Sequence, residues 1–260
     1  MAKIIAVVNQ KGGVGKTTTS VNLTAALTDL GKKVLLCDFD PQANATSGLG
    51  LDKRSLKHSI YDVLIQEVSA KEAITTTKFG DVLPATTDLA GAAVELISIE
   101  KPNSRLKEVL EPIKDNYDVI LIDCPPSLEM LTLNALTAAE GILVPVQCEY
   151  YALEGLGQLL NTIKLVKKHL NKNIEVEGAL LTMFDTRTNL SKQVVDEVKG
   201  YFGDKVYKTV IPRNIKLSEA PSYGVPITIY DARSKGAKCY DKLGKELISN
   251  NEQSKAKHMK

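Results

Sequence analysis

The sequence lacks a large excess of either charge, a long hydrophobic run and any paired cysteine spacing. It has 33 lysine and arginine residues against 31 aspartate and glutamate residues, a net charge of +2, so no overall field favours a nucleic-acid or membrane partner. Any such partner must be met by a local basic patch. The four cysteines have no C-x-x-C spacing, which argues against structural zinc and against a secreted disulfide framework. They are Cys37, Cys124, Cys148 and Cys239.

The hydrophobic runs are short. The first of them, residues 4–8, is too short for a signal-peptide core, and no stretch approaches the ~18 apolar residues of a transmembrane helix. We therefore expect a cytoplasmic protein. With 260 residues and 43% hydrophobic content, the chain can build one compact domain with a substantial core. We expect this domain over residues 1–250, followed by a polar, disordered tail over residues 251–260.

Apolar runs rich in β-branched residues recur along the chain and are mostly separated by segments with helical periodicity. They cover residues 3–9, 34–38, 119–123, 141–146, 177–184 and 206–211. This alternation predicts an α/β fold with a mainly parallel, twisted sheet and helices on both faces. The chemistry is expected at the C-terminal ends of the strands. Residues 51–104 are less regular and are expected at one edge.

A glycine-rich segment follows the first predicted strand and precedes a predicted helix over residues 18–30. It reads Lys11-Gly-Gly-Val-Gly-Lys-Thr-Thr18. In this context Gly12, Gly13 and Gly15 let backbone N–H groups face phosphate oxygens. Lys16 can reach the β- and γ-phosphates, and the Thr17 hydroxyl can bind Mg²⁺.

The strict G-x-x-x-x-G-K-[ST] pattern nevertheless fails, because Gln10 stands where its first glycine should be. An additional lysine, Lys11, is present instead. The structural alternative is a glycine-rich turn with incidental lysines.

Aspartates follow two of the predicted strands. Asp38 and Asp40 come after the second run, and Asp123 follows the fully apolar run 119–122. A carboxylate in the position of Asp123 is typical of the Walker B arrangement, in which it holds Mg²⁺ directly or through water. Alternatively, each aspartate starts a turn next to a proline.

Three motifs together resemble the ParA/MinD superfamily of deviant Walker A ATPases, most closely its Soj-type members. They cover residues 11–18, 38–47 and 123–127. The resemblance continues through residues 145–155 and 211–221, so it extends over nearly the whole chain. It implies an ATPase that depends on ATP and Mg²⁺.

The resemblance also implies that ATP lies between two subunits. Lys11 then reaches the partner's phosphates, and this second cation offsets charge that develops in the transition state. Asp40 corresponds to the carboxylate that orients the attacking water, and Asp38 to one that orders the water shell of Mg²⁺. Gly12 is expected near the dimer axis.

By the same resemblance, residues later in the chain contribute base and interface contacts. Pro212, Arg213 and Asn214 are expected on the adenine side, and Glu149 at the subunit interface. The alternatives are that Pro212 ends a strand and that Glu149 opens a helix beginning near Leu153. The nucleotide-binding set implied by the resemblance is Lys11, Gly12, Gly13, Val14, Gly15, Lys16, Thr17, Thr18, Pro212, Arg213 and Asn214. The metal set is Thr17, Asp38 and Asp123, and the catalytic set is Lys11, Lys16 and Asp40.

Soj-type proteins bind double-stranded DNA without sequence preference as ATP-bound homodimers. Arg187 and Lys216 match basic positions of the family, and Lys192, Lys235 and Lys238 could extend the patch. Most surface lysines are only solvated, so the last three are as consistent with an ordinary surface. The resemblance further implies stimulation by a centromere-binding ParB-type partner, association with the nucleoid, and a role in chromosome or plasmid segregation.

Three related classes share the phosphate chemistry and are the alternatives to a Soj-type protein. A MinD-like positioning ATPase requires a C-terminal amphipathic helix, but residues 251–260 lack bulky apolar side chains, so no stable membrane anchor is expected. An iron protein of the nitrogenase type needs two cysteines per subunit for its cluster. Cys124 lies near the phosphate site, but no second cysteine occupies a matching context. A tyrosine-kinase relative would have a tyrosine cluster in its tail, and no tyrosine follows Tyr240.

Overall fold

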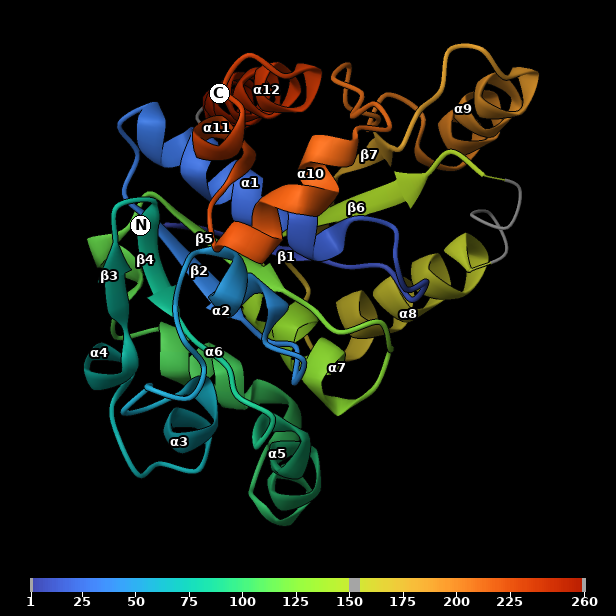
Figure 1. Cartoon of the computed structure of the whole chain (residues 1–260). Coiled ribbons are helices and arrows are strands. Elements are labelled where there is room, and N and C mark those ends of the chain that lie inside the picture. Colours follow the sequence, from blue (N-terminus) through green and yellow to red (C-terminus); the bar gives the residue numbers. More distant parts are fainter. Residues whose placement is uncertain (1, 150–154, 259–260) are drawn as a thin grey trace.

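The computed structural model describes residues 2–149 and 155–258. Within these residues, seven strands form one sheet in the order β3-β4-β2-β5-β1-β6-β7, parallel except for the antiparallel β3–β4 pair (Figure 1). The strands are β1 (Lys3–Val7), β2 (Val34–Asp38), β3 (Thr75–Thr77), β4 (Gly80–Leu83), β5 (Val119–Asp123), β6 (Gly141–Gln147) and β7 (Glu175–Thr182). The predicted parallel α/β fold is confirmed.

Successive residues of the central strands point to opposite faces of the sheet and build two cores. In β1, Ile4 and Ala6 join one core, and Ile5 and Val7 join the other. All four are almost fully buried, because helices cover both faces. This explains why these strands are apolar throughout instead of alternating with polar residues.

The helices divide between the two faces. The first face carries α3 (Ile60–Leu64), α4 (Ala70–Ala73), α5 (Leu89–Glu95), α6 (Arg105–Leu110), α7 (Met130–Ala138), α8 (Leu156–His169) and α9 (Asn189–Phe202). The second carries α1 (Lys16–Asp29), α2 (Asn44–Gly48), α10 (Ile215–Glu219), α11 (Ile227–Tyr230) and α12 (Lys235–His258). Helix α12 packs along α1, and both lie on the same side of the sheet in Figure 1.

Two sequence predictions about elements are wrong. Residues 206–211 do not form a sixth long strand; they follow the outer edge of β7 through isolated bridges at Val206 and Pro212. Residues 251–258 are not a disordered tail, because α12 continues to His258. The Lys3 Nζ atom donates to the Asn251 side chain at 2.6 Å, which attaches this part of the helix to the start of β1. Good helix-forming residues in this segment also favour continuation.

The topology places the phosphate motif at the middle of the sheet. After β1 the chain crosses to β2, and β5 and β6 later take the positions on either side of β1. The C-terminal end of β1 is therefore the point where strand order reverses, and ligands of open α/β sheets bind at this point. In the part of the chain that the structure describes, no helix combines the length and the apolar character needed to cross a bilayer.

Candidate nucleotide site

The glycine loop joins the end of β1 to the N-terminus of α1, in the place that the sequence predicted. Gly13 and Gly15 have φ angles of 72° and 90°, which side chains with a Cβ rarely adopt. The carbonyl of buried Val14 accepts a hydrogen bond of 2.8 Å from the Thr182 hydroxyl at the end of β7. The Lys11 amide donates to the Asn9 side chain at 3.0 Å. These contacts fix the loop in a shape that presents the N-terminus of a 14-residue helix to an anion.

Lys16 points back over this loop. Its Nζ atom donates to the Lys11 carbonyl at 3.1 Å, and the residue is only 6% exposed. Burial lowers the pKa of Lys16, while the negative charge of Asp123 opposes this shift. A buried cation inside a cradle of backbone donors matches the requirements of a polyphosphate.

Asp38 and Asp123 end the neighbouring strands β2 and β5 and are register partners. Both are fully buried, and burial together with mutual repulsion raises the pKa of Asp123. Burial also raises the pKa of Asp38, although its Oδ2 accepts hydrogen bonds of 2.7 Å from both the amide and the hydroxyl of Thr46. Two adjacent buried carboxylates are an arrangement that favours a nearby cation.

The oxygen atoms around Asp123 fit a hard divalent cation. The Thr17 hydroxyl donates to its Oδ2 atom at 2.7 Å, so a hydroxyl and a carboxylate lie side by side at the start of α1. Magnesium prefers such oxygen ligands and usually keeps waters and phosphate oxygens in its shell. No group of three or more histidine, cysteine or acidic side chains suited to metal binding occurs among residues 2–149 and 155–258, so a cation here would need further oxygens from the nucleotide and from water.

Asp40 lies two residues beyond β2 and is 8% exposed. Its Oδ1 atom accepts from the Gln42 amide at 2.9 Å, and its own amide donates to Asp38 Oδ1 at 3.3 Å. These two bonds fix the turn that carries the carboxylate. Asp40 is therefore held beside the Asp38 and Asp123 pair.

A cavity of about 240 Å³ adjoins the glycine loop on the side of α10. Its wall includes Gly15 from the loop, Thr18 from the first turn of α1, and Pro212, Arg213 and Asn214 from the predicted adenine-side segment. The size suits one ring system with the phosphates outside it. The fold thus brings these residues together, although about 195 positions separate them in sequence. Tyr240 from α12 also lines the cavity, and it was not predicted from the sequence.

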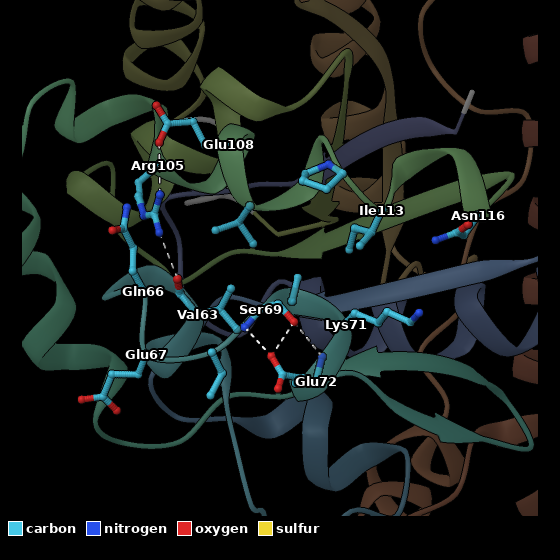
Figure 2. A pocket seen from close by; sticks show the side chains of 14 residues that line it. Val63, Gln66, Glu67, Ser69, Lys71, Glu72, Arg105, Glu108, Ile113 and Asn116 are labelled. Atoms are coloured by element: carbon cyan, nitrogen blue, oxygen red, sulfur yellow. Dashed lines mark hydrogen bonds and ion pairs between the residues drawn. The ribbon is translucent and has the colours of Figure 1, made fainter.

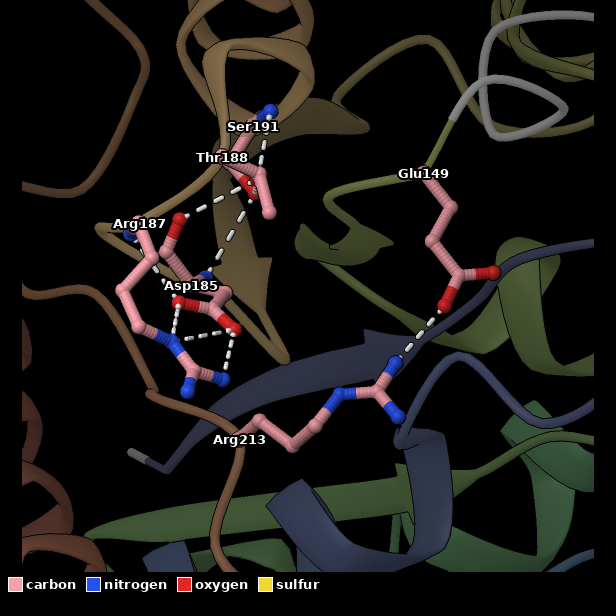
Figure 3. Close-up of polar contacts among 6 residues, drawn as sticks. All are labelled: Glu149, Asp185, Arg187, Thr188, Ser191 and Arg213. Carbon is pink, nitrogen blue, oxygen red and sulfur yellow. Dashed lines mark hydrogen bonds and ion pairs between the residues drawn. The ribbon is translucent and has the colours of Figure 1, made fainter.

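Glu149 and Arg213 form an ion pair of 2.8 Å between Oε1 and Nη2, visible in Figure 3. Helix α8 begins at Leu156 with Gly155 as its N-cap. The alternative, a helix that Glu149 opens near Leu153, concerns residues 150–154, which lie outside the described residues. Pro212 does not end a regular strand, because the segment before it forms only isolated bridges.

The basic residues predicted for DNA lie on separate elements outside this site. Arg187 precedes α9 and pairs with Asp185, and Lys216 in α10 pairs with Glu219 at 2.9 Å. Lys192 lies in the first turn of α9, and Lys235 and Lys238 lie in the first turn of α12; all three are exposed. The two residues that match the family most closely are therefore both engaged in ion pairs.

A larger hollow of about 670 Å³ lies on the other face of the sheet, between α4 and α6 (Figure 2). Of the described residues that line it, Arg105 alone is a buried charged side chain. The guanidinium donates to the carbonyls of Val63 and Leu64 and pairs with Glu108 at 3.1 Å. The donors of Arg105 thus hold α3 against α6, so its charge serves the fold.

Sequence reasoning missed the polar residues that support the carboxylates. Ser20 donates to Asp123 Oδ1 at 2.8 Å, and Thr46 holds Asp38. A signal for Ser20 was present, because it lies four residues after Lys16 and so on the same face of α1. Thr46 lies in the quoted motif of residues 38–47, but its partner could not be read from spacing.

We predict that Ser20→Ala lowers the free energy of unfolding by about 1–2 kcal/mol, because the buried carboxylate of Asp123 loses a hydrogen-bond donor. The higher helix propensity of alanine offsets only a small part of this loss. Urea denaturation measures the change. Ser249→Ala is the matched control: it makes the same substitution at an exposed position of α12, so it should be neutral or slightly stabilising. Equal stability of Ser20→Ala and wild type would contradict the supporting role of the hydroxyl.

The glycine loop, its buried lysine and the paired strand-end carboxylates define a P-loop nucleotide-binding protein. Residues 2–176 match the model of the protein family described as AAA domain. The chain is 60% identical to the sporulation initiation inhibitor protein Soj of Bacillus subtilis, over 96% of this chain and 100% of that protein. It is 52% identical to the chromosome-partitioning ATPase Soj of Treponema pallidum, over 96% of this chain and 98% of that protein. The chain belongs to the ParA/Soj family of chromosome-partitioning ATPases.

A solved structure supports the interpretation of the site. Cobyrinic acid a,c-diamide synthase from Mycobacterium smegmatis, with bound ATP analog and magnesium, has a TM-score of 0.87 and 39% identity. The match covers 98% of this chain and 97% of that one. Its ligands are the two that the sequence leads us to expect. Its name describes a different overall reaction, so the likeness concerns the nucleotide-binding fold.

Proposed function

We propose that the protein is an ATP-hydrolysing DNA-partitioning protein of the cytoplasm and nucleoid, acting in segregation of a chromosome or plasmid. The observation that carries the proposal is the contact between Thr17 and Asp123 beside the glycine loop. It joins a hydroxyl and a carboxylate at a helix N-terminus, as a metal–nucleotide complex requires. The membership of the ParA/Soj family connects this site with partitioning.

In this proposal each residue of the site has one task. Loop residues 12–18 bind the phosphates, with Lys16 as the cation closest to them, and Pro212, Arg213 and Asn214 border the base. Thr17 and Asp123 hold Mg²⁺, which when bound neutralises phosphate charge, and Asp38 orders its water shell. Asp40 orients the attacking water.

The active form in this proposal is a homodimer. Lys11 is half-exposed on the glycine loop. From this position its side chain would reach the phosphates of a nucleotide bound to a second subunit. Gly12 is exposed beside it and would lie at the dimer axis, and Glu149 would belong to the interface. ATP binding then favours dimerisation, because each nucleotide contributes to the contact between the subunits.

Arg187 and Lys216, extended by Lys192, Lys235 and Lys238, would contact DNA phosphates without reading bases. A dimer doubles the number of these cations, so affinity increases steeply when ATP is bound. A ParB-type protein would stimulate hydrolysis and return the protein to its monomeric state. Residues 1–250 would act as one ATPase domain.

DNA co-sedimentation with ATP, ADP or no nucleotide tests the proposal. Wild type is expected to bind only with ATP, without sequence preference and more weakly at higher salt. Arg187→Glu should lower affinity by roughly 10- to 100-fold at low salt, because a phosphate contact becomes a repulsion. The matched control is Lys168→Glu, which reverses an exposed charge on α8, a helix that covers the same face of the sheet as α9 but is a separate element.

The control variant should bind DNA as wild type does. ATP-dependent dimerisation without DNA binding in wild type would leave an ATPase whose partner is a protein or a membrane. If Arg187→Glu and Lys168→Glu lose the same amount of DNA affinity, Arg187 contributes only through the net charge of the protein.

A further inference from the structure

Arg187 is a highly exposed residue whose hydrogen-bond donors are occupied by a neighbouring carboxylate. Its side chain is 85% exposed, yet its guanidinium makes a two-pronged contact with Asp185, with Nε to Oδ1 at 2.9 Å and Nη2 to Oδ2 at 2.6 Å (Figure 3). The Arg187 amide also donates to Asp185 Oδ1 at 3.0 Å. Both the backbone and the side chain of Arg187 are thus bound by one carboxylate.

Asp185 is fixed by the start of α9. Its carbonyl accepts from the Thr188 amide and hydroxyl, both at 3.3 Å, and the Thr188 hydroxyl accepts from the Ser191 amide as the N-cap of the helix. The carboxyl side chain is only 22% exposed. Hydrogen bonds from Arg187 hold the pKa of Asp185 far below its usual range, with a further contribution from the charge of Arg213.

The loop that carries this pair is hydrogen-bonded to the segment bordering the base cavity. The Phe184 amide donates to the Ile211 carbonyl at 3.1 Å, and the Arg213 amide donates to the Phe184 carbonyl at 3.2 Å. In Figure 3 the Arg213 side chain runs from this segment toward Glu149, while Arg187 turns to Asp185. The loop with Asp185 and Arg187 is therefore joined by backbone hydrogen bonds to the segment that borders the cavity.

We propose that Asp185 is an internal competitor for Arg187, whose carboxylate occupies the guanidinium donors that a nucleic-acid phosphate would take. This inference rests on the proposed DNA-binding function. Carboxylate and phosphate accept from the same fork of guanidinium N–H groups, so only one can take the two-pronged contact. An exposed pair of this kind contributes little stability, so the exchange is reversible.

Competition by Asp185 weakens the contact that one subunit can make with DNA. A single subunit then binds poorly, and binding becomes appreciable when two subunits act together, since affinity depends on the number of phosphate contacts made at once. Asp185 would therefore make DNA binding more dependent on the dimer.

Asp185→Asn tests this inference, because asparagine keeps the Oδ1 acceptor for the Arg187 amide and removes the charge. ATP-dependent DNA affinity is measured by fluorescence anisotropy with a labelled duplex over a range of salt. Affinity is expected to rise roughly three- to tenfold at low salt, and the slope of log K against log salt to become more negative by up to about 0.9 for each subunit of the dimer. Sedimentation of each ATP-loaded variant ensures that equally dimeric samples are compared.

Two further variants separate a specific effect from one of net charge. Asp204→Asn removes one charge from an exposed aspartate just beyond α9 and should change affinity much less than Asp185→Asn. In an Arg187→Gln background, Asp185→Asn should lose most of its effect.

Failure of this inference can be distinguished from failure of the proposed DNA-binding function. If wild type binds DNA with ATP but Asp185→Asn binds equally or more weakly, Asp185 is not a competitor and the inference fails while the proposed function stands. Equal gains from Asp204→Asn and Asp185→Asn, or a gain that persists in Arg187→Gln, would also overturn the inference. If neither wild type nor Asp185→Asn binds DNA with ATP, the proposed function fails together with it.

Discussion

Asp40→Ala is expected to bind ATP and to dimerise while its kcat falls by roughly 100- to 10,000-fold, the range for loss of a group that assists proton transfer or water positioning. The expectation follows from the position of Asp40 beside Asp38 and Asp123 and outside the glycine loop. The loop retains Lys16 and its backbone donors, so nucleotide binding depends little on this carboxylate. Single-turnover phosphate release at saturating ATP measures the chemical step, and sedimentation measures dimerisation.

Asp40→Asn is the matched variant for this prediction. It retains the Oδ1 atom that accepts from the Gln42 amide, so the turn is preserved while the negative charge is lost. Slow hydrolysis in both variants would assign the effect to the charge. Slow hydrolysis in Asp40→Ala together with normal hydrolysis in Asp40→Asn would assign the effect to the shape of the turn. Normal turnover in Asp40→Ala would remove Asp40 from the mechanism.

Gly12→Val is expected to bind nucleotide as a monomer. A Cβ atom at Gly12 meets nothing within 4 Å in the single chain, and Gly12, unlike Gly13 and Gly15, has no positive φ angle in the range that disfavours a side chain. The substitution should therefore leave the subunit intact and act only where a partner approaches. A clash of about 3 kcal/mol at the dimer axis would raise the dimer dissociation constant about a hundredfold. Analytical ultracentrifugation with ATP checks this value.

Two further substitutions make the test of Gly12 specific. Gly200→Val places the same side chain at an open position of α9 and should leave dimerisation unchanged. Gly15→Val imposes valine on a φ angle of 90° and should instead weaken nucleotide binding by the subunit itself. A stable ATP-bound dimer of Gly12→Val would contradict the position proposed for Gly12.

The order of the central elements could be predicted because each has a local pattern. The apolar runs at residues 34–38 and 119–123 agree with β2 and β5 as observed, and the predicted helix after the glycine loop differs from α1 by no more than two residues at either end. The proximity of Asp38 and Asp123 also followed from sequence, since parallel strands that end at one edge bring their last residues together.

Other features depend on contacts between distant segments. Residues 206–211 carry a strand-like pattern because Tyr207 and Ile211 are buried against the sheet, but only isolated bridges join the segment to β7. A hydrophobic pattern records which side chains are buried and does not record whether the backbone ladder continues. The short strands β3 and β4 were missed for the opposite reason, since three and four residues give too little periodicity.

The sequence by itself determined that this chain carries a phosphate loop between a strand and a helix, with carboxylates at the ends of neighbouring strands, because these features are encoded by adjacent residues. Only the tertiary structure decided that Pro212, Arg213 and Asn214 border a cavity beside Gly15, that Ser20 and Thr46 hold the carboxylates, and that Asp185 takes the donors of Arg187. The physical reason is that burial, hydrogen-bond partners and charge pairing depend on which side chains the packed fold brings within a few ångströms of one another.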